Sequence, residues 1–182
     1  MKLIFASQNR NKAKEIESIL GEKFEVVSLN ELGFHDELNE SFSTFEENAL
    51  QKARFISNYF KVNCFAEDSG LEVDALGGAP GVFSARYAGE GKNSTDNNLK
   101  LLNAMKEKKN RRANFRTVIA LIYDGKEYLF EGEVFGEILY ELFGENGFGY
   151  DPLFKPDGYE KSFGELGEEI KNKISHRAIA IN

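Results

Sequence analysis

Lys2-Leu3-Ile4-Phe5-Ala6 is a short apolar run near the start of the chain, and the polar turn Ser7-Gln8-Asn9-Arg10-Asn11-Lys12 follows it directly. A run of this length and polarity predicts a buried β-strand. Residues 13–20 then place apolar side chains at helical spacing, and Gly21 is a typical residue to end a helix. A second apolar run, Phe24–Leu29, predicts another strand. The order strand, turn, helix, strand indicates an α/β protein.

The rest of the chain continues this alternation of helices and strands. The pattern predicts a helix from Thr44, a strand over Val62–Ala66, a helix over roughly 95–109, and strands over Phe115–Tyr123 and Glu127–Val134. Asp124-Gly125, between the last two strands, is a strong hairpin signal. No linker, repeat or low-complexity tract interrupts the pattern, so we expect one domain over residues 1–182.

Composition limits the classes of function. The 182 residues carry 23 Lys and Arg against 30 Asp and Glu, which is a formal net charge of −7. This balance argues against a broad nucleic-acid surface, but not against a small anionic ligand held locally. No apolar run approaches the about 20 residues of a membrane span, and the first residues become polar too quickly for a signal peptide. With Cys64 as the single cysteine, these features predict a cytoplasmic protein without disulfides or a cysteine-based zinc site.

Two polar stretches follow predicted strands and suit phosphate chemistry. Ser7–Lys12 leads into a helix, and a helix N-terminus attracts phosphate through its N–H groups and partial positive charge. Glu67-Asp68-Ser69-Gly70 follows the strand predicted at 62–66, where adjacent acids suit Mg²⁺. On a strand, Glu67 and Asp68 would point to opposite faces and therefore do different work. The alternative for both stretches is an ordinary turn or helix cap.

Three further stretches combine glycines, aromatic rings and basic residues. Leu76–Gly89 contains four glycines, and its Arg86 would either clamp a phosphate or form a surface salt bridge. Gly147-Phe148-Gly149-Tyr150-Asp151-Pro152 offers two rings for stacking on a base and one carboxylate acceptor, although most rings in this chain are expected in the core. Lys171-Asn172-Lys173-Ile174-Ser175-His176-Arg177 gathers donors that suit an anion or a carbonyl oxygen.

Taken together, these segments resemble the inosine triphosphate pyrophosphatase family, hydrolases that remove non-standard purine nucleoside triphosphates. The matching segments occur in the family's order and span nearly the whole chain: SQNRNK (7–12), TFEENALQKA (44–53), AEDSGLEVDALGGAPGVFSARYAG (66–89), FGYDPLF (148–154) and KNKISHRA (171–178).

The resemblance implies a fold and an assembly. The expected fold is an elongated, two-lobed single domain of the α/β class, with a mixed central sheet, flanking helices and the substrate in a cleft between the lobes. A homodimer is also implied. Relatives continue after SHRA into a longer helix, whereas this sequence stops at Asn182, so the terminal packing and part of the dimer contact are expected to differ.

The resemblance also implies a reaction and residue roles. The family hydrolyses dITP, ITP and XTP between the α- and β-phosphates with Mg²⁺, giving the nucleoside monophosphate and pyrophosphate. By position in the motifs, Ser7–Lys12 would bind the triphosphate, Asp68 would hold Mg²⁺ and accept a proton, and Ser69 would contact the substrate. The residues implied to bind base and sugar are Phe148, Gly149, Tyr150, Asp151, Lys171, His176 and Arg177.

A second metal ligand is implied at Glu40, four residues before the Thr-Phe pair. The loop departs from the family pattern E-x-G-x-T-F, because Phe42 stands in place of the glycine. Glu47 is either a site residue or part of a capping box. In such a box the Thr44 hydroxyl and the Glu47 carboxylate satisfy exposed backbone N–H groups.

These residue types suit the expected chemistry. Mg²⁺ neutralises phosphate oxygens and lowers the pKa of water, and a nearby carboxylate takes the proton as water attacks the α-phosphorus. Lys12 would stabilise the departing pyrophosphate. Inosine and xanthosine carry an oxygen acceptor at the purine 6-position, where adenine carries an amino donor, so donors in the 171–177 segment would discriminate between them. The alternatives are a pyrophosphatase for modified pyrimidine nucleotides and a nucleotide-binding regulatory module without catalysis.

Overall fold

The structure is a computed structural model that describes residues 2–21 and 24–182. Met1, which belongs to the segment tested above as a signal peptide, lies outside the described residues. The strands are β1 (Lys2–Phe5), β2 (Glu25–Ser28), β3 (Cys64–Val73), β4 (Arg112–Tyr123), β5 (Lys126–Ile138) and β6 (Phe154–Pro156). The α-helices are α1 (Arg10–Leu20), α2 (Phe45–Phe60), α3 (Ser94–Ala104), α4 (Phe163–Ile174) and α5 (His176–Ile181), and the short 3₁₀ helices are η2 (Asp74–Leu76), η3 (Gly81–Arg86) and η4 (Asp151–Leu153).

Within the described residues, the strands form one six-stranded mixed sheet in the order β2-β1-β3-β4-β5-β6. β1 pairs in parallel with β2 and β3, whereas β5 pairs antiparallel with β6. Asp124 and Gly125, which join β4 to β5, both have positive φ (49° and 74°), as a two-residue hairpin turn of the primed type requires. The predicted α/β class, the mixed sheet and the hairpin are therefore confirmed.

Backbone contacts divide the chain into two compact units. The first unit contains the described residues of Met1–Asp68, together with Thr117–Gly132 and Arg177–Asn182. The second unit contains Ser69–Arg116 and Glu133–His176. Each unit has a hydrophobic core of its own, although β3 and β4 contribute residues to both. The assignment of residues 1–182 to a single domain stays a prediction.

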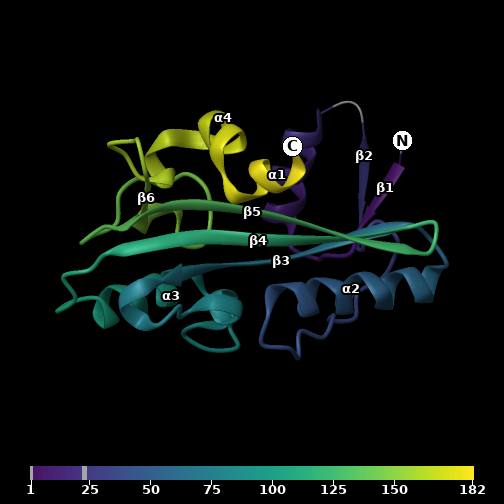
Figure 1. Cartoon of the computed structure of the whole chain (residues 1–182), viewed down its shortest axis with the longest axis horizontal. Helices are drawn as coiled ribbons and strands as arrows, with labels where there is room; N and C mark the ends of the chain where they lie inside the picture. Colours follow the sequence, from purple (N-terminus) through teal and green to yellow (C-terminus); the bar gives the residue numbers. More distant parts are fainter. Residues whose placement is uncertain (1, 22–23) are drawn as a thin grey trace. The chain divides into compact units, whose positions relative to one another are not determined.

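In the first unit, α1 and α5 cover one face of the strands and α2 covers the other (Figure 1). The core under α1 and α5 joins Phe5 of β1 and Phe65 of β3, whose rings stack with their centres 4.8 Å apart, to Ile16 and Ala180 of the two helices. Apolar burial of this kind stabilises by about 25 cal/mol per Å². It holds the last helix of the chain against the same strands as the first.

In the second unit, α3 and α4 lie on opposite sides of the strands (Figure 1). Leu101 of α3 and Met105, which follows the end of this helix, belong to the same buried cluster as Phe115, Phe154 and Phe163. The rings of Phe115 and Phe154 meet edge to face with their centres 4.7 Å apart, a favoured aromatic geometry. Four of the eleven buried residues of this cluster are aromatic, in line with the expectation that most rings of the chain lie in the core.

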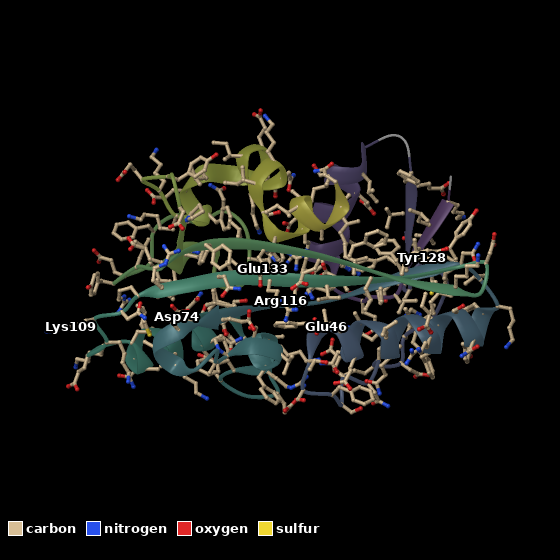
Figure 2. All side chains as sticks on the ribbon, in the orientation of Figure 1. Glu46, Asp74, Lys109, Arg116, Tyr128 and Glu133 are labelled. Carbon is tan, nitrogen blue, oxygen red and sulfur yellow. The ribbon has the colours of Figure 1, made fainter. Side chains whose placement is uncertain are left out.

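Polar side chains also pair across the strands of the second unit. Arg116 of β4 and Glu133 of β5 point toward one another (Figure 2), with 3.5 Å between Nε and Oε1. Asn114, also on β4, donates to Glu72 of β3 at 3.0 Å. Pairs of this partly exposed kind contribute at most about 1 kcal/mol each, so the buried core remains the main source of stability.

Two predicted boundaries are wrong. β3 runs from Cys64 to Val73, so Glu67–Gly70 lies inside a strand and is neither a strand end nor a turn. The hydrogen bonds of neighbouring strands hold this polar stretch extended, and a local apolar pattern does not show them. The helix predicted over 95–109 ends at Ala104, because residues 106–109 offer no apolar face to bury.

The helix caps agree in part with the prediction. Thr44 caps α2, because its hydroxyl accepts from the Glu47 backbone N–H at 3.3 Å. The Glu47 carboxylate, however, accepts from the Thr44 hydroxyl at 2.7 Å instead of from a backbone N–H, so a reciprocal capping box is not formed here. The complete capping box lies at the start of α4, between Ser162 and Glu165.

Candidate active site

Asp68 lies on β3 in the first unit, only 4% exposed, and two side chains of α2 reach its carboxylate. Asn48 Nδ2 donates to Asp68 Oδ2 at 2.9 Å, and Lys52 Nζ lies 3.9 Å from Oδ1. Lys52 also forms an ion pair with Glu40. One ammonium group therefore faces both carboxylates that the sequence predicted as metal ligands.

Sequence reasoning did not single out Asn48 and Lys52. They stand four residues apart, so α2 presents them on one face, and both are buried. Asn48 also accepts from the backbone N–H of Phe42 at 2.9 Å and donates to its carbonyl at 3.2 Å, which ties the loop carrying Glu40 to the helix. Two polar residues at this spacing, in the middle of a stripe of buried apolar residues, were the available signal.

The surroundings of Asp68 shift its protonation. Burial raises the pKa of Asp68, and the neighbouring charge of Glu40 raises it further. The charges of Lys52 and Lys12 and the hydrogen bond from Asn48 oppose this change, but the pKa stays above its ordinary value. An ionised carboxylate with a raised pKa is a stronger base than an exposed aspartate.

The donor set around Asp68 fits Mg²⁺. Glu40 and Asp68 supply carboxylate oxygens, and both face the positively charged ammonium group of Lys52. Nowhere in residues 2–21 and 24–182 do three or more His, Cys, Asp or Glu side chains gather in a way that would hold a metal ion. Mg²⁺ commonly binds to one or two carboxylates together with substrate phosphates. The pair therefore fits a metal that binds together with the substrate.

Glu67 contacts elements on the face of β3 opposite to that of Asp68. Its two carboxylate oxygens accept from Arg177 Nε at 2.8 Å and Nη2 at 3.1 Å, and Lys12 Nζ lies 2.9 Å from Oε1. Arg177 Nη1 also donates to Glu15 at 3.1 Å. The expectation that the two side chains point to opposite faces of the strand is therefore confirmed, and their different roles stay a prediction.

The charge state of Glu67 follows from these contacts. Burial alone would raise the pKa of Glu67, but the charges of Arg177 and Lys12 outweigh burial and hold the pKa well below its ordinary range. The buried carboxylate is therefore ionised at neutral pH. It engages the guanidinium of Arg177, which the family resemblance implied as a contact to base and sugar.

The turn Ser7–Lys12 leads into α1, as predicted. Asn9 caps the helix, because its Oδ1 accepts from the backbone N–H groups of Asn11 at 3.0 Å and Lys12 at 3.2 Å. Ser7 Oγ in turn accepts from the backbone N–H of Asn9 at 3.1 Å. Asn9 therefore shapes the turn as a hydrogen-bond acceptor. The remaining members of the turn are Gln8, which donates to the Asp36 carbonyl at 2.8 Å, and the exposed Arg10.

The second unit brings together three of the residues predicted for base recognition. Lys171 of α4 is buried, and its Nζ lies 2.7 Å from Asp151 Oδ2 and 4.4 Å from the centre of the Phe148 ring. The same Oδ2 accepts from the backbone N–H of Phe148 at 2.7 Å. A side chain at Gly147 would place its Cβ 2.1 Å from this oxygen, so glycine is required there. Lys171, Asp151 and Phe148 therefore form one connected cluster.

Other residues predicted for base recognition are placed differently. The Tyr150 ring belongs to the core, where burial raises the pKa of its hydroxyl, and this hydroxyl donates to the Ser84 carbonyl at 2.8 Å. The suggestion that its ring stacks on a base is therefore wrong. The buried His176 ring stacks on Phe115 with the centres 5.0 Å apart. His176 belongs to the second unit, whereas Arg177 belongs to the first.

Three remaining candidates have plain structural positions. Glu47 is exposed at the start of α2, and Ser69 is half-buried next to Asp68 on β3. Arg86 ends η3, and its guanidinium carbon lies 5.4 Å from the centre of the Phe83 ring. Each is compatible with a contact to a ligand, and the roles of all three stay predictions.

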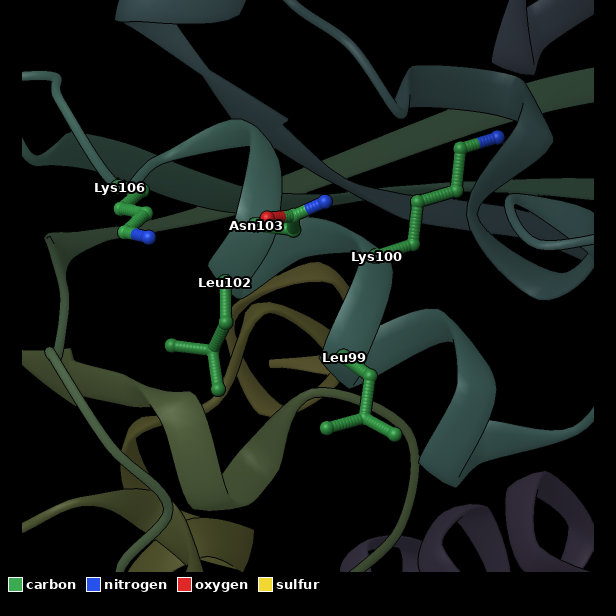
Figure 3. A pocket seen from close by; sticks show the side chains of 5 residues that line it. All are labelled: Leu99, Lys100, Leu102, Asn103 and Lys106. Carbon is green, nitrogen blue, oxygen red and sulfur yellow. The ribbon is translucent and has the colours of Figure 1, made fainter.

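Two hollows lie apart from these residues. A cavity of about 240 Å³ in the first unit is lined by apolar side chains, among them Ile16, Phe65 and Ile119. An open hollow of about 650 Å³ runs along α3 in the second unit (Figure 3), and its lining residues are Leu99, Lys100, Leu102, Asn103 and Lys106. Neither contains a predicted site residue or a carboxylate. The candidate site residues therefore form two separate clusters, one around Asp68 in the first unit and one around Lys171 in the second.

Comparisons with known proteins show which family the chain resembles over its length. A model described as the Ham1 family matches residues 3–182. A dITP/XTP pyrophosphatase of Flavobacterium johnsoniae is 51% identical over 181 residues, covering 100% of this chain and 94% of that protein. One of Porphyromonas gingivalis is 51% identical over 181 residues, covering 99% of this chain and 93% of that protein. The solved structure of the Staphylococcus aureus Ham1 protein superposes with a TM-score of 0.89 at 42% identity, covering 100% of this chain and 95% of that one.

The helices of the described chain include none long and apolar enough to cross a membrane.

The full-length matches confirm the resemblance to pyrophosphatases of non-standard purine nucleotides that the motifs indicated. They also confirm the α/β fold with its mixed sheet. The chain belongs to the Ham1 family.

Proposed function

We propose that this chain hydrolyses the non-standard purine nucleoside triphosphates dITP, ITP and XTP to a nucleoside monophosphate and pyrophosphate. The observation that carries the proposal is the buried Asp68 carboxylate, which faces Lys52 together with Glu40 in a chain of the Ham1 family. Phosphoanhydride hydrolysis needs a base for water and cations for the phosphate oxygens. This cluster supplies the base and one cation. Relatives with about half of their residues in common bear the name dITP/XTP pyrophosphatase.

Mg²⁺ is the proposed cofactor, and Glu40 and Asp68 would hold it. When bound, Mg²⁺ neutralises phosphate oxygens and makes water a stronger acid. Lys52 would remain beside the two carboxylates and add a positive charge toward the anionic substrate. The chain as a whole is acidic, so cations concentrated at this point are what would attract a triphosphate.

Asp68 is the proposed proton acceptor. Asn48 fixes one carboxylate oxygen by its hydrogen bond, and burial raises the pKa of Asp68. The fixed orientation of the carboxylate and its raised pKa would favour proton abstraction from a water that attacks the α-phosphorus. A positioned general base contributes about 10²–10⁴-fold to a rate.

Lys12 and the turn before α1 are the proposed triphosphate site. The N-terminal end of a helix carries a partial positive charge that favours phosphate. Glu67 holds the Lys12 ammonium in place at 2.9 Å, so this cation is positioned before substrate binds. It would stabilise the charge that develops on the departing pyrophosphate. Ser69, which follows Asp68 on β3, would contact the substrate as well.

The second unit supplies the proposed base contacts. Asp151 orients the Lys171 ammonium beside the Phe148 ring, which is half-buried and suited to stacking on a purine. A donor at this position pairs with the 6-oxygen of hypoxanthine or xanthine, whereas the amino group of adenine would leave it unpaired. Sites that hydrogen-bond a substrate group reject analogues without it by about 10⁴–10⁵-fold. His176 would assist as a second buried donor.

We further propose that the protein acts in the cytoplasm as a homodimer and has no nucleic-acid partner. A lone buried thiol, Cys64, suits a reducing compartment. The net charge of −7 supports the absence of a broad nucleic-acid surface.

The test is a product analysis with a panel of nucleotides. The wild-type protein is incubated with Mg²⁺ and dITP, XTP, dATP, dGTP or a modified pyrimidine triphosphate. We expect one pyrophosphate for each monophosphate, a kcat/KM for dITP more than about 100-fold above that for dATP, and loss of turnover with EDTA that added Mg²⁺ reverses. Release of orthophosphate, or equal rates on dITP and dATP, would overturn the proposal. Preference for the pyrimidine, or binding without turnover, would instead favour one of the two alternatives.

A further inference from the structure

We propose that Asn98 of α3 is a positioning residue for base recognition, because it holds the carbonyl of Gly149 and thereby orients the loop that presents Phe148. The inference rests on the proposed function, since the nucleotide base is what this loop would contact. Asn98 itself would not touch the substrate.

The geometry of Asn98 is unusual for a residue that only packs. Its side chain is 5% exposed, and Nδ2 donates to the Gly149 carbonyl, 51 positions away in the chain, at 2.9 Å. Within the described residues, its buried Oδ1 has no hydrogen-bond donor in reach. Buried acceptors without a partner lower stability, and a leucine of similar size would avoid this cost. Stability alone therefore does not explain an amide at this position, whereas the bond to Gly149 does.

The loop that Asn98 contacts needs such support. Gly147 and Gly149 both have positive φ (79° and 64°), and glycine has more backbone freedom than any other residue. On one side of Phe148 the loop is fixed, because the Phe148 N–H donates to Asp151. On the other side, Asn98 fixes the peptide between Gly149 and Tyr150. Without this bond the Phe148 ring would sample several orientations over Lys171.

The preceding residue of α3 supports the same region. Asn97 is buried, and its side chain donates to the Ala85 carbonyl at 2.9 Å and accepts from the Ala88 N–H at 2.6 Å. The Tyr150 hydroxyl then joins the two loops by donating to the Ser84 carbonyl. Two adjacent asparagines on one helix thus bind two segments of the second unit, Asn97 the residues around 85–88 and Asn98 the loop at Gly149. Asn98 is the member that acts on the predicted base contacts.

The test separates base recognition from phosphate binding. Asn98→Leu keeps the approximate size of the side chain, does not lower helix propensity, and removes the donor to Gly149. Steady-state constants are measured for dITP and dATP, and inhibition is measured with inorganic tripolyphosphate, which has the phosphates but no base. We expect the KM for dITP to rise about tenfold and the kcat/KM preference for dITP over dATP to fall about tenfold. The inhibition constant of tripolyphosphate should change less than about twofold.

Two further variants keep the proposal falsifiable. Asn98→Asp has the same shape but sets a carboxylate against the Gly149 carbonyl, so we expect the same changes in larger measure, and it serves if the leucine variant does not fold. Asn103→Leu changes an exposed asparagine of the same helix, on the face shown in Figure 3, and should leave all constants within about twofold. Unchanged KM and preference in both Asn98 variants would overturn the proposal. An equal loss of tripolyphosphate inhibition would also overturn it, because it would reveal a general structural role.

A failure of the proposed function is recognised separately. Binding of deoxyinosine monophosphate to the wild type and the variants is measured by calorimetry. If the wild type binds this nucleotide without hydrolysing dITP, the proposed function falls, and the affinities of the variants still decide the role of Asn98. If the wild type neither binds nor hydrolyses, both proposals fall.

Discussion

Glu67 and Arg177, which are 110 positions apart in the chain, form a two-pronged ion pair with N–O distances of 2.8 and 3.1 Å in the interior of the first unit. The planar guanidinium matches the carboxylate in this fork geometry, which gives the strongest charge-assisted hydrogen bonds. Lys12 contacts the same carboxylate, so one buried acid organises two cations. The pair fixes the start of α5 to the centre of β3.

Removal of this acid should cost much stability. We expect Glu67→Gln to lower the free energy of unfolding at pH 7 by about 3–5 kcal/mol, because Arg177 and Lys12 lose the charge that compensates them in a buried position. Urea unfolding of both proteins measures the difference. The matched control is Glu127→Gln, which breaks the exposed pair with Arg54 and should cost less than about 1 kcal/mol. Similar losses in the two variants would show that burial of the Glu67 pair is unimportant.

The contribution of Glu67 should also depend on pH. Its pKa in the folded protein lies below the pKa in an unfolded chain. At pH values between the two, the folded state therefore binds fewer protons than the unfolded state. The stabilisation is therefore complete above the unfolded pKa of about 4.3 and is lost as the pH falls toward the folded value. Unfolding free energies of the wild type and Glu67→Gln, measured from pH 7 downward, should converge below about pH 4. A constant difference down to pH 3 would contradict the lowered pKa.

Unlike Glu67, Asp68 should be needed for activity without stabilising the fold at neutral pH. Its pKa is raised in the folded protein, so its contribution to stability is lost as the pH rises from the ordinary value through the raised one. We expect Asp68→Asn to reduce turnover by about 10²–10⁴-fold, yet to leave the unfolding temperature without Mg²⁺ at pH 7 equal or higher. Pyrophosphate release and thermal unfolding measure the two effects. A variant that loses activity and also melts earlier would point to a structural role instead.

Lys52 should set the pH range in which Asp68 acts as a base. The Lys52 charge lowers the pKa of Asp68, so Lys52→Met should move the acidic limb of the kcat/KM profile to higher pH and reduce the maximal rate at least about tenfold. Lys52→Arg keeps the charge and should restore the position of that limb. Lys126→Met, at an exposed lysine of β5, is the control and should leave the profile unchanged. An unshifted limb in Lys52→Met would separate Lys52 from the chemistry.

Lys171 should affect the base more than the phosphates. Lys171→Met removes the buried ammonium beside Phe148 and takes away the ion pair of the Asp151 carboxylate. We expect the preference for dITP over dATP to fall about 10²-fold or more, whereas inhibition by tripolyphosphate should change only slightly. Competition assays with the three compounds measure this. Equal weakening of all three would assign Lys171 to phosphate binding.

The hydrogen bonds of Asn48 to Asp68 and of Asn98 to Gly149 show what a local sequence pattern does not predict. The cap at Thr44 was recognisable, because a helix cap depends on residues within a few positions of one another. Asn48 and Asn98 were not singled out, because their partners Asp68 and Gly149 lie 20 and 51 positions away. A polar residue on a helix face says nothing by itself about what it meets.

The sequence alone predicted the α/β class, the hairpin at Asp124-Gly125 and the residues of the motifs. These features depend on strand polarity, turn chemistry and motif order, which can be recognised from residues close together in the chain. Tertiary structure decided the length of β3, the burial of Tyr150 and the partner of Arg177. Each of these depends on which distant side chain or strand supplies the hydrogen bonds and charges, and a buried polar group is stable only where they are supplied. Folding therefore placed Arg177 against Glu67, although its neighbours in the sequence suggested a ligand.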